Sequence, residues 1–144
     1  MFNKKSRFYI FSLMLVLAIV LTQIVPVLAA PGDTTRIDVD SNGVGANSSS
    51  EYSSVSADGR YVAFESFADN LVDGDTNGVE DIFLRDTQMN TTTRVSLASD
   101  GAQGNGESWS HALSADGRYV AFSSSSDNLV SGDTNMGFDV FVRD

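Results

Sequence analysis

The chain has 144 residues, with nine Lys and Arg against nineteen Asp and Glu, a formal net charge of −10 and no cysteine. This length accommodates one ordinary domain at most, and the lack of cysteine excludes disulfides, a thiol nucleophile and any Cys-ligated metal site. The hydrophobic content of 42% is sufficient for a folded core, so a wholly disordered chain is not expected.

Residues 1–30 have the composition of a secretory signal peptide. Basic residues lie near the start, residues 8–28 carry no charge, and Ala29 ends a cleavage site of small or apolar residues. Because about 20 apolar residues can also span a bilayer, an uncleaved anchor is the alternative, and Pro26 beside the cleavage site favours the signal peptide. In either case the rest of the chain is expected to be secreted, periplasmic or on the cell surface.

Removal of this leader makes the chain more acidic. Six basic and nineteen acidic residues remain, a charge of −13. Such a field repels phosphate groups and anionic lipid headgroups, so we expect no nucleic-acid partner and no membrane contact beyond the leader. The acidity favours cations, or it serves only to keep an exported domain soluble.

An internal repeat organises the remainder of the chain. Residues 34–86 align without a gap to residues 92–144 at an offset of 58, and 29 of the 53 positions are identical. The sequence SADGRYVAF at residues 56–64 recurs unchanged at residues 114–122. A fixed period of this length is typical of propellers and other repeat arrays. We therefore divide the chain into a first repeat at residues 34–91 and a second, truncated repeat at residues 92–144.

Each repeat reads as short strands, and no helical periodicity is found beyond the leader. Two Asp-Gly pairs predict hairpins, the strongest short-range signal of paired strands, joining residues 52–56 to 60–66 and residues 110–114 to 118–124. Four further strands are predicted, at residues 34–40, 81–86, 92–98 and 139–144. Four antiparallel strands make one propeller blade, so the predicted fold is all-β, with two four-stranded blades in an incomplete propeller behind the hydrophobic signal helix.

The order of these motifs resembles the WD-repeat-like β-propeller repeats of TolB-type proteins. The resemblance rests on a hydrophobic-Ser-x-Asp-Gly-Arg-Tyr-Val-Ala-Phe segment, a polar loop, and then Asp-Ile/Val-Phe-Leu/Val-Arg-Asp, and it covers residues 34–144. It implies that the strand before Asp-Gly faces a central channel. It also implies a non-catalytic protein, such as a periplasmic partner of envelope proteins or a propeller attached to a peptidase.

Two blades cannot close a propeller, because each blade needs neighbours to bury its faces. The chain is then a fragment of a longer propeller, or several copies assemble into a ring, or residues 34–40 complete the last blade as a closing strand. We expect a fragment, with self-assembly as the alternative.

An acidic loop in the first repeat has the spacing of a calcium site. Oxygen ligands at positions 1, 3, 5 and 9 and a carbonyl at position 7 suit the six to eight oxygens that calcium takes, and these positions are Asp73, Asp75, Asn77, Asp81 and Val79. The loop resembles the calcium loops of certain β-propellers, such as integrin α-subunits, and the start of an EF-hand, although Leu84 replaces the bidentate Glu. The interpretation without metal is a plain turn in which Asp and Asn bond their own backbone.

The second copy of this loop is a poorer calcium site. It keeps Asp133, Asn135 and Asp139 but has Ser131 at its first position, and fewer carboxylates lower the affinity. Met136 replaces a glycine at the sixth position, where a left-handed turn is costly for a side chain.

No catalytic constellation is found, and we predict that the protein is not an enzyme. His111 is the only histidine, and Ser53 stands at its position in the first repeat, so a polar channel lining is the expected role rather than a general base. Trp109 could stack on a sugar, but Glu51 stands at its equivalent, and burial is expected instead. The leading function is an exported protein-binding scaffold stabilised by calcium; the alternatives are a carbohydrate-binding module of the envelope and an accessory propeller of a secreted hydrolase.

Overall fold

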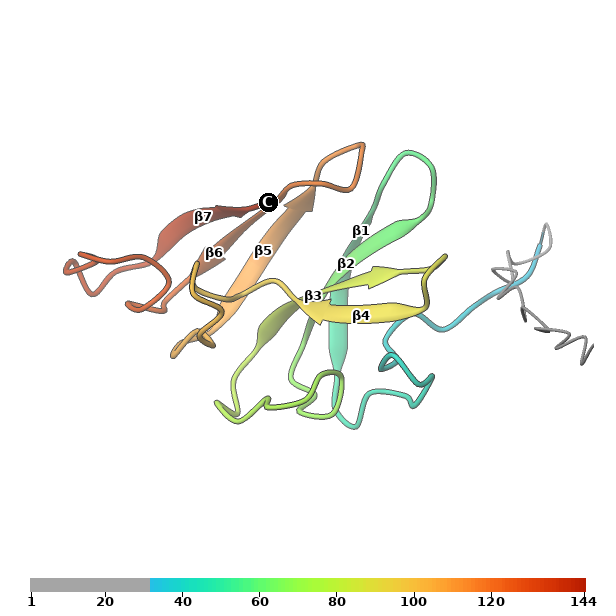
Figure 1. The fold of residues 1–144 in the computed structure, drawn as a ribbon, viewed down its shortest axis with the longest axis horizontal. Coiled ribbons are helices and arrows are strands. Elements are labelled where there is room, and N and C mark those ends of the chain that lie inside the picture. Colours follow the sequence, from blue (N-terminus) through green and yellow to red (C-terminus); the bar gives the residue numbers. More distant parts are fainter. Residues whose placement is uncertain (1–31) are drawn as a thin grey trace, which may run out of the picture.

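The computed structural model describes residues 32–144, and the predicted signal peptide or anchor lies outside these residues. They form an all-β structure of two antiparallel sheets without a helix (Figure 1). The first sheet contains, in this order, β1 (Ser50–Val55), β2 (Tyr61–Ser66), β3 (Asp81–Asp86) and β4 (Thr91–Arg94). The second sheet contains β5 (Ser108–Leu113), β6 (Val120–Ser124) and β7 (Asp139–Arg143).

The two predicted hairpins are confirmed. β1 pairs with β2 and β5 with β6, both antiparallel. Gly59 and Gly117 lie in the two turns with φ of 75°, a left-handed conformation that glycine adopts at low cost. In the first turn Asp58 accepts hydrogen bonds from the Ser56 hydroxyl at 2.6 Å and from the Arg60 backbone N–H at 3.0 Å. Each Asp-Gly motif therefore closes its own hairpin by local hydrogen bonds.

Alternation along the strands gives the first sheet two apolar faces. Phe64 and Phe83 are neighbours across β2 and β3 with ring centroids 5.8 Å apart, and they pack with Leu71 on one face. Ala63 and Ile82 point to the other face, where they meet a cluster from the second repeat, namely Val95, Val120, Phe122 and Leu129. The main core therefore lies between the two sheets, which lie beside one another in Figure 1.

The segment before β1 covers the first sheet in the way that the segment after β4 covers the second. Val39 forms an isolated bridge with Gly45, and Leu97 forms the same bridge with Gln103, 58 residues later. Arg85 of β3 donates to the Asp40 carbonyl at 3.0 Å. At the same offset, Arg143 of β7 donates to the carbonyl oxygen of Ala98, also at 3.0 Å. The 58-residue repeat is therefore a repeat of tertiary contacts as well as of sequence.

Two predicted strands differ from the structure within residues 32–144, and the second predicted blade is only partly formed. Residues 34–40 form no strand, because no neighbouring strand of the described chain pairs with them beyond the single bridge at Val39. β4 ends at Arg94 instead of residue 98, where the chain leaves the sheet and turns into the core at Val95. The second sheet has the three strands predicted within residues 110–144, and no fourth strand of the described chain pairs with β7 to complete a four-stranded blade.

The structure also places no helix in residues 32–144 that is long and apolar enough to cross a bilayer. This finding concerns the described residues alone.

Stacking of the two sheets gives equivalent residues different burial, which provides a test. Ile82 is fully buried, whereas its counterpart Val140 is 76% exposed. We expect Ile82→Ala to lower the free energy of unfolding by about 2–5 kcal/mol through loss of packing, and Val140→Ala to change it by less than about 0.5 kcal/mol. Urea denaturation followed by circular dichroism measures both, and similar losses in the two variants would contradict the stacking.

Candidate functional site

The acidic loop between β2 and β3 closes around Asp81, the first residue of β3. Asp81 is fully buried. Its Oδ1 accepts a hydrogen bond from the Ser96 hydroxyl at 2.5 Å, and its Oδ2 accepts one from the Asn77 amide at 2.9 Å. Burial raises the pKa of the Asp81 carboxyl, while the bonds from Ser96 and Asn77 oppose that rise.

A guanidinium group lies where the loop carboxylates converge. Nη1 of Arg94, from β4, is 3.2 Å from Asp81 and 3.4 Å from Asp75, and all three side chains are at most 5% exposed. Gln103 also donates to Asp75 at 3.3 Å. Burial raises the pKa of Asp75, and the charge of Arg94 opposes this rise. Arg94 therefore supplies positive charge to the same two carboxylates that the sequence assigned to calcium.

The remaining predicted ligands of this loop are arranged differently from those two carboxylates, and the Asn77 side chain reaches Asp81 through its amide nitrogen. Asp73 is exposed, and the Asn77 amide oxygen accepts the backbone N–H of Val79 at 3.2 Å. Gly78, the glycine at the sixth position of this loop, has φ of 67°, a left-handed conformation that glycine adopts at low cost. Within residues 32–144 no group of three or more His, Asp or Glu side chains is placed to hold a metal ion. Calcium binding by this loop stays a prediction, which calorimetric titration with calcium tests.

The second loop repeats the local hydrogen bonds but has no arginine. Asn135 donates to Asp139 Oδ1 at 3.1 Å and accepts the Gly137 N–H at 2.7 Å. Met136 has φ of 52°, so the left-handed conformation expected there is confirmed. The other carboxylate oxygen of Asp139, Oδ2, is buried and has no hydrogen-bond partner. Asp133 is partly buried, and calcium stays a prediction here as well.

Arg94 and its repeat counterpart Arg36 make a matched pair for testing the buried ionic cluster. Arg36 pairs with Asp38, but its side chain is 58% exposed. We expect Arg94→Met to cost about 3–5 kcal/mol of unfolding free energy, because two buried carboxylates lose their partner. Arg36→Met should cost less than about 1 kcal/mol, as is usual for exposed pairs.

Urea denaturation at neutral pH measures both arginine variants. Equal stabilities of Arg94→Met and the wild type would show that Arg94 does not neutralise this cluster.

A second polar cluster lies between the sheets and was missed at the sequence level. His111 of β5 places Nδ1 3.2 Å from Glu65 of β2 and Nε2 3.0 Å from the Ala63 carbonyl. Glu65 also accepts the Ser110 N–H at 2.8 Å, and the side chains of His111 and Glu65 are at most 3% exposed. The expected lone channel-lining histidine is thus a buried partner of a carboxylate. Only the difference between repeats could have indicated it, since Ser53 and Ser123 replace the two residues.

This pair borders a cavity of about 370 Å3 with an unusual carboxyl group. Its lining consists of Tyr52, Glu65, Glu80, Trp109, Ser110 and His111. Burial raises the pKa of Glu80 to about 7, and the negative charges of three other glutamates add to the shift. Trp109 is half-buried and meets Phe138 edge to face at 5.1 Å. Aromatic rings beside carboxyl groups suit a polar ligand that offers hydroxyl groups.

The Glu80 carboxyl makes the stability of the protein depend on pH. Its pKa in the folded state, about 7, lies above the ordinary value of 4.5, so the folded state binds more protons than the unfolded state between these values. This contribution is fully present below pH 4.5 and is lost as the pH rises through 7. We expect Glu80→Gln to lose less stability than the wild type between pH 5 and pH 8.

Thermal unfolding at four pH values measures this difference. All other titrating groups are shared by the two proteins, so parallel curves would contradict the raised pKa of Glu80.

Comparison with known proteins finds no relative of this chain among family models or curated proteins. No protein-family model matches the chain, and a search of curated proteins finds no significant match.

Proposed function

We propose that this protein is an exported, non-catalytic β-propeller repeat segment that binds another protein through an open sheet face. The repeat period, the antiparallel sheets and their face-to-face contact support the propeller interpretation. The leader of residues 1–30 supports export. Calcium at the acidic loops belongs to the proposal as a stabilising ion and is not required for binding.

One observation carries the binding role: the second sheet exposes the face that the first sheet buries. Val140 and Val142 of β7 are 76% and 67% exposed, and Phe138 just before them is 76% exposed. We call this surface, defined by Phe138, Val140 and Val142, the outer face. At the equivalent positions of the first sheet, Ile82 and Leu84 belong to the core. An apolar patch of this kind marks an interaction site.

The charge of the chain favours a protein over other partners. With six basic residues against nineteen acidic ones after the leader, the surface repels nucleic acid and anionic lipid. The three side chains that define the outer face are apolar, so its natural complement is an apolar protein surface.

Charge substitution on the outer face tests this proposal. We expect Val140→Glu with Val142→Glu to abolish specific binding of the protein partner, because two carboxylates would have to be desolvated at the interface. The control is Gln88→Glu with Met89→Glu, which adds the same charge in the exposed turn between β3 and β4. Quantitative capture of proteins from the exported fraction of the producing cells measures binding, and retention by the outer-face variant refutes the proposal.

The cavity beside Trp109 favours carbohydrate binding as a second function. It combines two aromatic side chains with the Glu65 and Glu80 carboxyl groups. A glycan array probed with the wild type and with Trp109→Ala distinguishes this function, because a sugar stacked on the indole is lost in the variant. Binding that survives on the outer-face variant but not on Trp109→Ala favours the carbohydrate.

A further inference from the structure

β7 has a free edge where β3 has a partner. β3 pairs on one side with β2 and on the other with β4, whereas β7 pairs only with β6 in residues 32–144. In Figure 1, β7 lies at the border of the molecule, far from the segment that precedes β1. A free edge presents unpaired backbone N–H and C=O groups that can take up another strand.

The chain contains a second copy of the β4 sequence that belongs to no strand. Residues 34–36, Thr-Thr-Arg, repeat residues 92–94 of β4 at the 58-residue offset. Thr34, Thr35 and Arg36 are exposed and outside both sheets. In the described part of the chain, β7 thus lacks the neighbour that its counterpart β3 has, and a copy of that neighbour's sequence lies outside both sheets.

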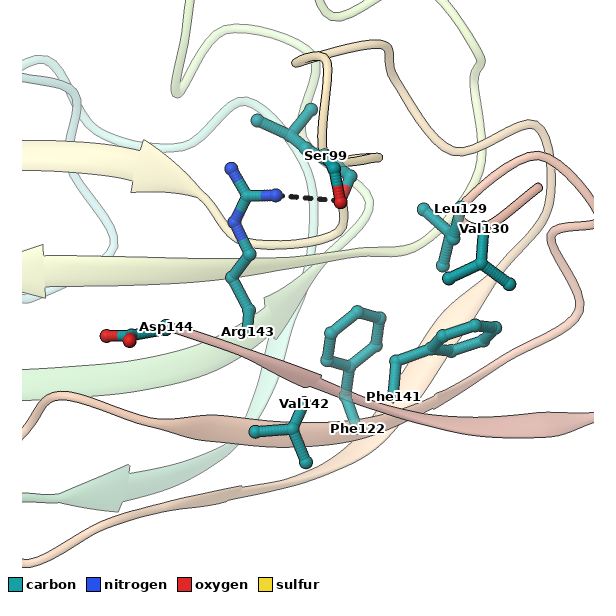
Figure 2. Close-up of a pocket in the computed structure, with 9 residues that line it drawn as sticks. Ser99, Phe122, Leu129, Val130, Phe141, Val142, Arg143 and Asp144 are labelled. Atoms are coloured by element: carbon teal, nitrogen blue, oxygen red, sulfur yellow. Dashed lines mark hydrogen bonds between the residues drawn. The ribbon is translucent and has the colours of Figure 1, made fainter.

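Contacts of Thr92 show what the missing strand would supply. In the first sheet the Thr92 hydroxyl donates to the Val39 carbonyl, its N–H donates to Ser41 Oγ at 3.1 Å, and Arg85 donates to its hydroxyl at 3.1 Å. The counterparts of these three partners are Leu97, Ser99 and Arg143, and all of them line a cavity of about 380 Å3 (Figure 2).

Figure 2 shows Arg143 reaching across this cavity towards the backbone beside Ser99, with Asp144 at the end of the strand. Phe122 and Phe141 stand on the cavity side of the sheet and Val142 points the other way. The cavity therefore lies where Thr92 is found in the first sheet.

The carboxylate of Asp139 indicates the same missing strand. In the first sheet the Asp81 oxygen that Asn77 bonds also accepts from Arg94, and Ser96 donates to the other oxygen. In the second sheet Asn135 bonds Asp139 Oδ1, and Oδ2, the counterpart of the oxygen that Ser96 reaches, is buried with no partner. The counterpart of Arg94 is the exposed Arg36. A buried carboxylate without its donors is costly, and an arginine from outside would supply the charge that Arg94 gives to Asp81.

We propose that this protein associates head to tail with a second copy of itself, residues 34–36 of one copy adding to β7 of the next as its fourth strand. The proposal rests on the proposed function and names its partner. The register of β3 with β4 pairs Leu84 with Thr93 and Phe83 with Arg94. Transferred by 58 residues, it pairs Val142 with Thr35, and Phe141 with Arg36, of the second copy. Thr34 then enters the cavity of Figure 2, and Arg36 reaches Asp139.

The same association covers the outer face. Within the chain, β5 and β6 lie on the face of the first sheet that carries Ile82. There the Tyr61 ring lies so close to Gly117 that an added Cβ would stand 2.2 Å from it. Its counterpart Tyr119 is 40% exposed, and nothing lies within 4 Å of the Cβ position of Gly59. The first sheet of a second copy would therefore bring Gly59 against Tyr119 and would cover Val140.

One residue of the second copy differs from the residue at the equivalent place in the contact within one chain, and this difference weakens the association of two copies. Ser96, which donates to Asp81, corresponds to Asp38. Asp38 would bring a further carboxylate next to Asp139, with Arg36 between the two. Because the contact joins two different surfaces of the protein, each copy can bind a further copy. The assembly is then a closed ring or an open filament.

Disulfide trapping tests the register, and the natural lack of cysteine makes it unambiguous. A tagged full chain with Thr35→Cys is mixed in nonionic detergent with an untagged full chain carrying Val142→Cys, under mild oxidation. Directly paired residues lie within the 4.4–6.8 Å Cα separation that a disulfide spans. A register that differs by more than about one residue therefore prevents the cross-link. The Leu84→Cys, Thr93→Cys chain calibrates the yield within one molecule, and Val140→Cys, two residues out of register, is the control.

We expect the Thr35→Cys and Val142→Cys chains to cross-link in about tenfold excess over the Val140→Cys control. Arg36→Met should lower association in sedimentation velocity about tenfold, the factor for one charge-assisted hydrogen bond. Asp38→Ser, which restores the residue of the internal contact, should raise it. Thermal unfolding of both variants shows that they are folded.

Equal cross-linking of the two cysteine positions, or a chain that sediments as a monomer and ignores Arg36→Met and Asp38→Ser, overturns the proposal. A monomeric chain whose outer-face variant still loses capture of a different protein overturns self-association alone and leaves the proposed function standing. If neither self-association nor capture depends on the outer face, both fail.

Discussion

Burial of one face of the first sheet by the second sheet is the contact on which the rest of this structure depends. Ala63 and Ile82 have no exposed surface because Val120 and Phe122 of the next unit lie over them. One repeat unit of four short strands cannot bury its hydrophobic faces alone and needs a neighbouring unit against it. The hydrophobic free energy of the fold is therefore released mainly between units, and each unit makes its neighbour stable.

This dependence explains why one surface is left apolar. The second unit carries the same alternation as the first, so it presents Val140 and Val142 on the side where the first unit presents Ile82 and Leu84. Nothing in residues 32–144 covers them. In the described residues the second unit also has no neighbour of its own to supply a strand at the edge of β7 or a donor for Asp139 Oδ2. An apolar face, an open edge and an unpaired buried oxygen thus have one structural origin.

Buried polar contacts are more specific than the apolar ones. Arg94 joins the acidic loop to β4 within the first sheet, and the His111–Glu65 pair joins the two sheets. Each places charge in a region that is nearly closed to water, where an unpaired group would be costly. The pair of His111 and Glu65 exists only once, because both positions are serine in the other unit. Such differences between otherwise identical units fix which surface meets which.

Local patterns predicted much of the fold because their physical causes are local. The Asp-Gly turns bond to their own hairpins, and alternation in residues 81–86 and 139–143 decides which side chains share a face. The prediction for residues 34–40 was wrong although their sequence matches a true strand at residues 92–94. A strand exists only where another strand accepts its backbone hydrogen bonds, and that depends on position in the fold.

The sequence by itself determined the repeat, its period, the hairpins, the left-handed turn at Met136 and the acidity of the loops. Only the tertiary structure decided that Arg94 lies between Asp75 and Asp81, that His111 has a carboxylate partner, and which of two equivalent apolar faces is covered. The reason is physical: turns and alternation act over a few residues, whereas these contacts join residues 13 to 46 positions apart. Their energies depend on burial, which exists only once the sheets have met.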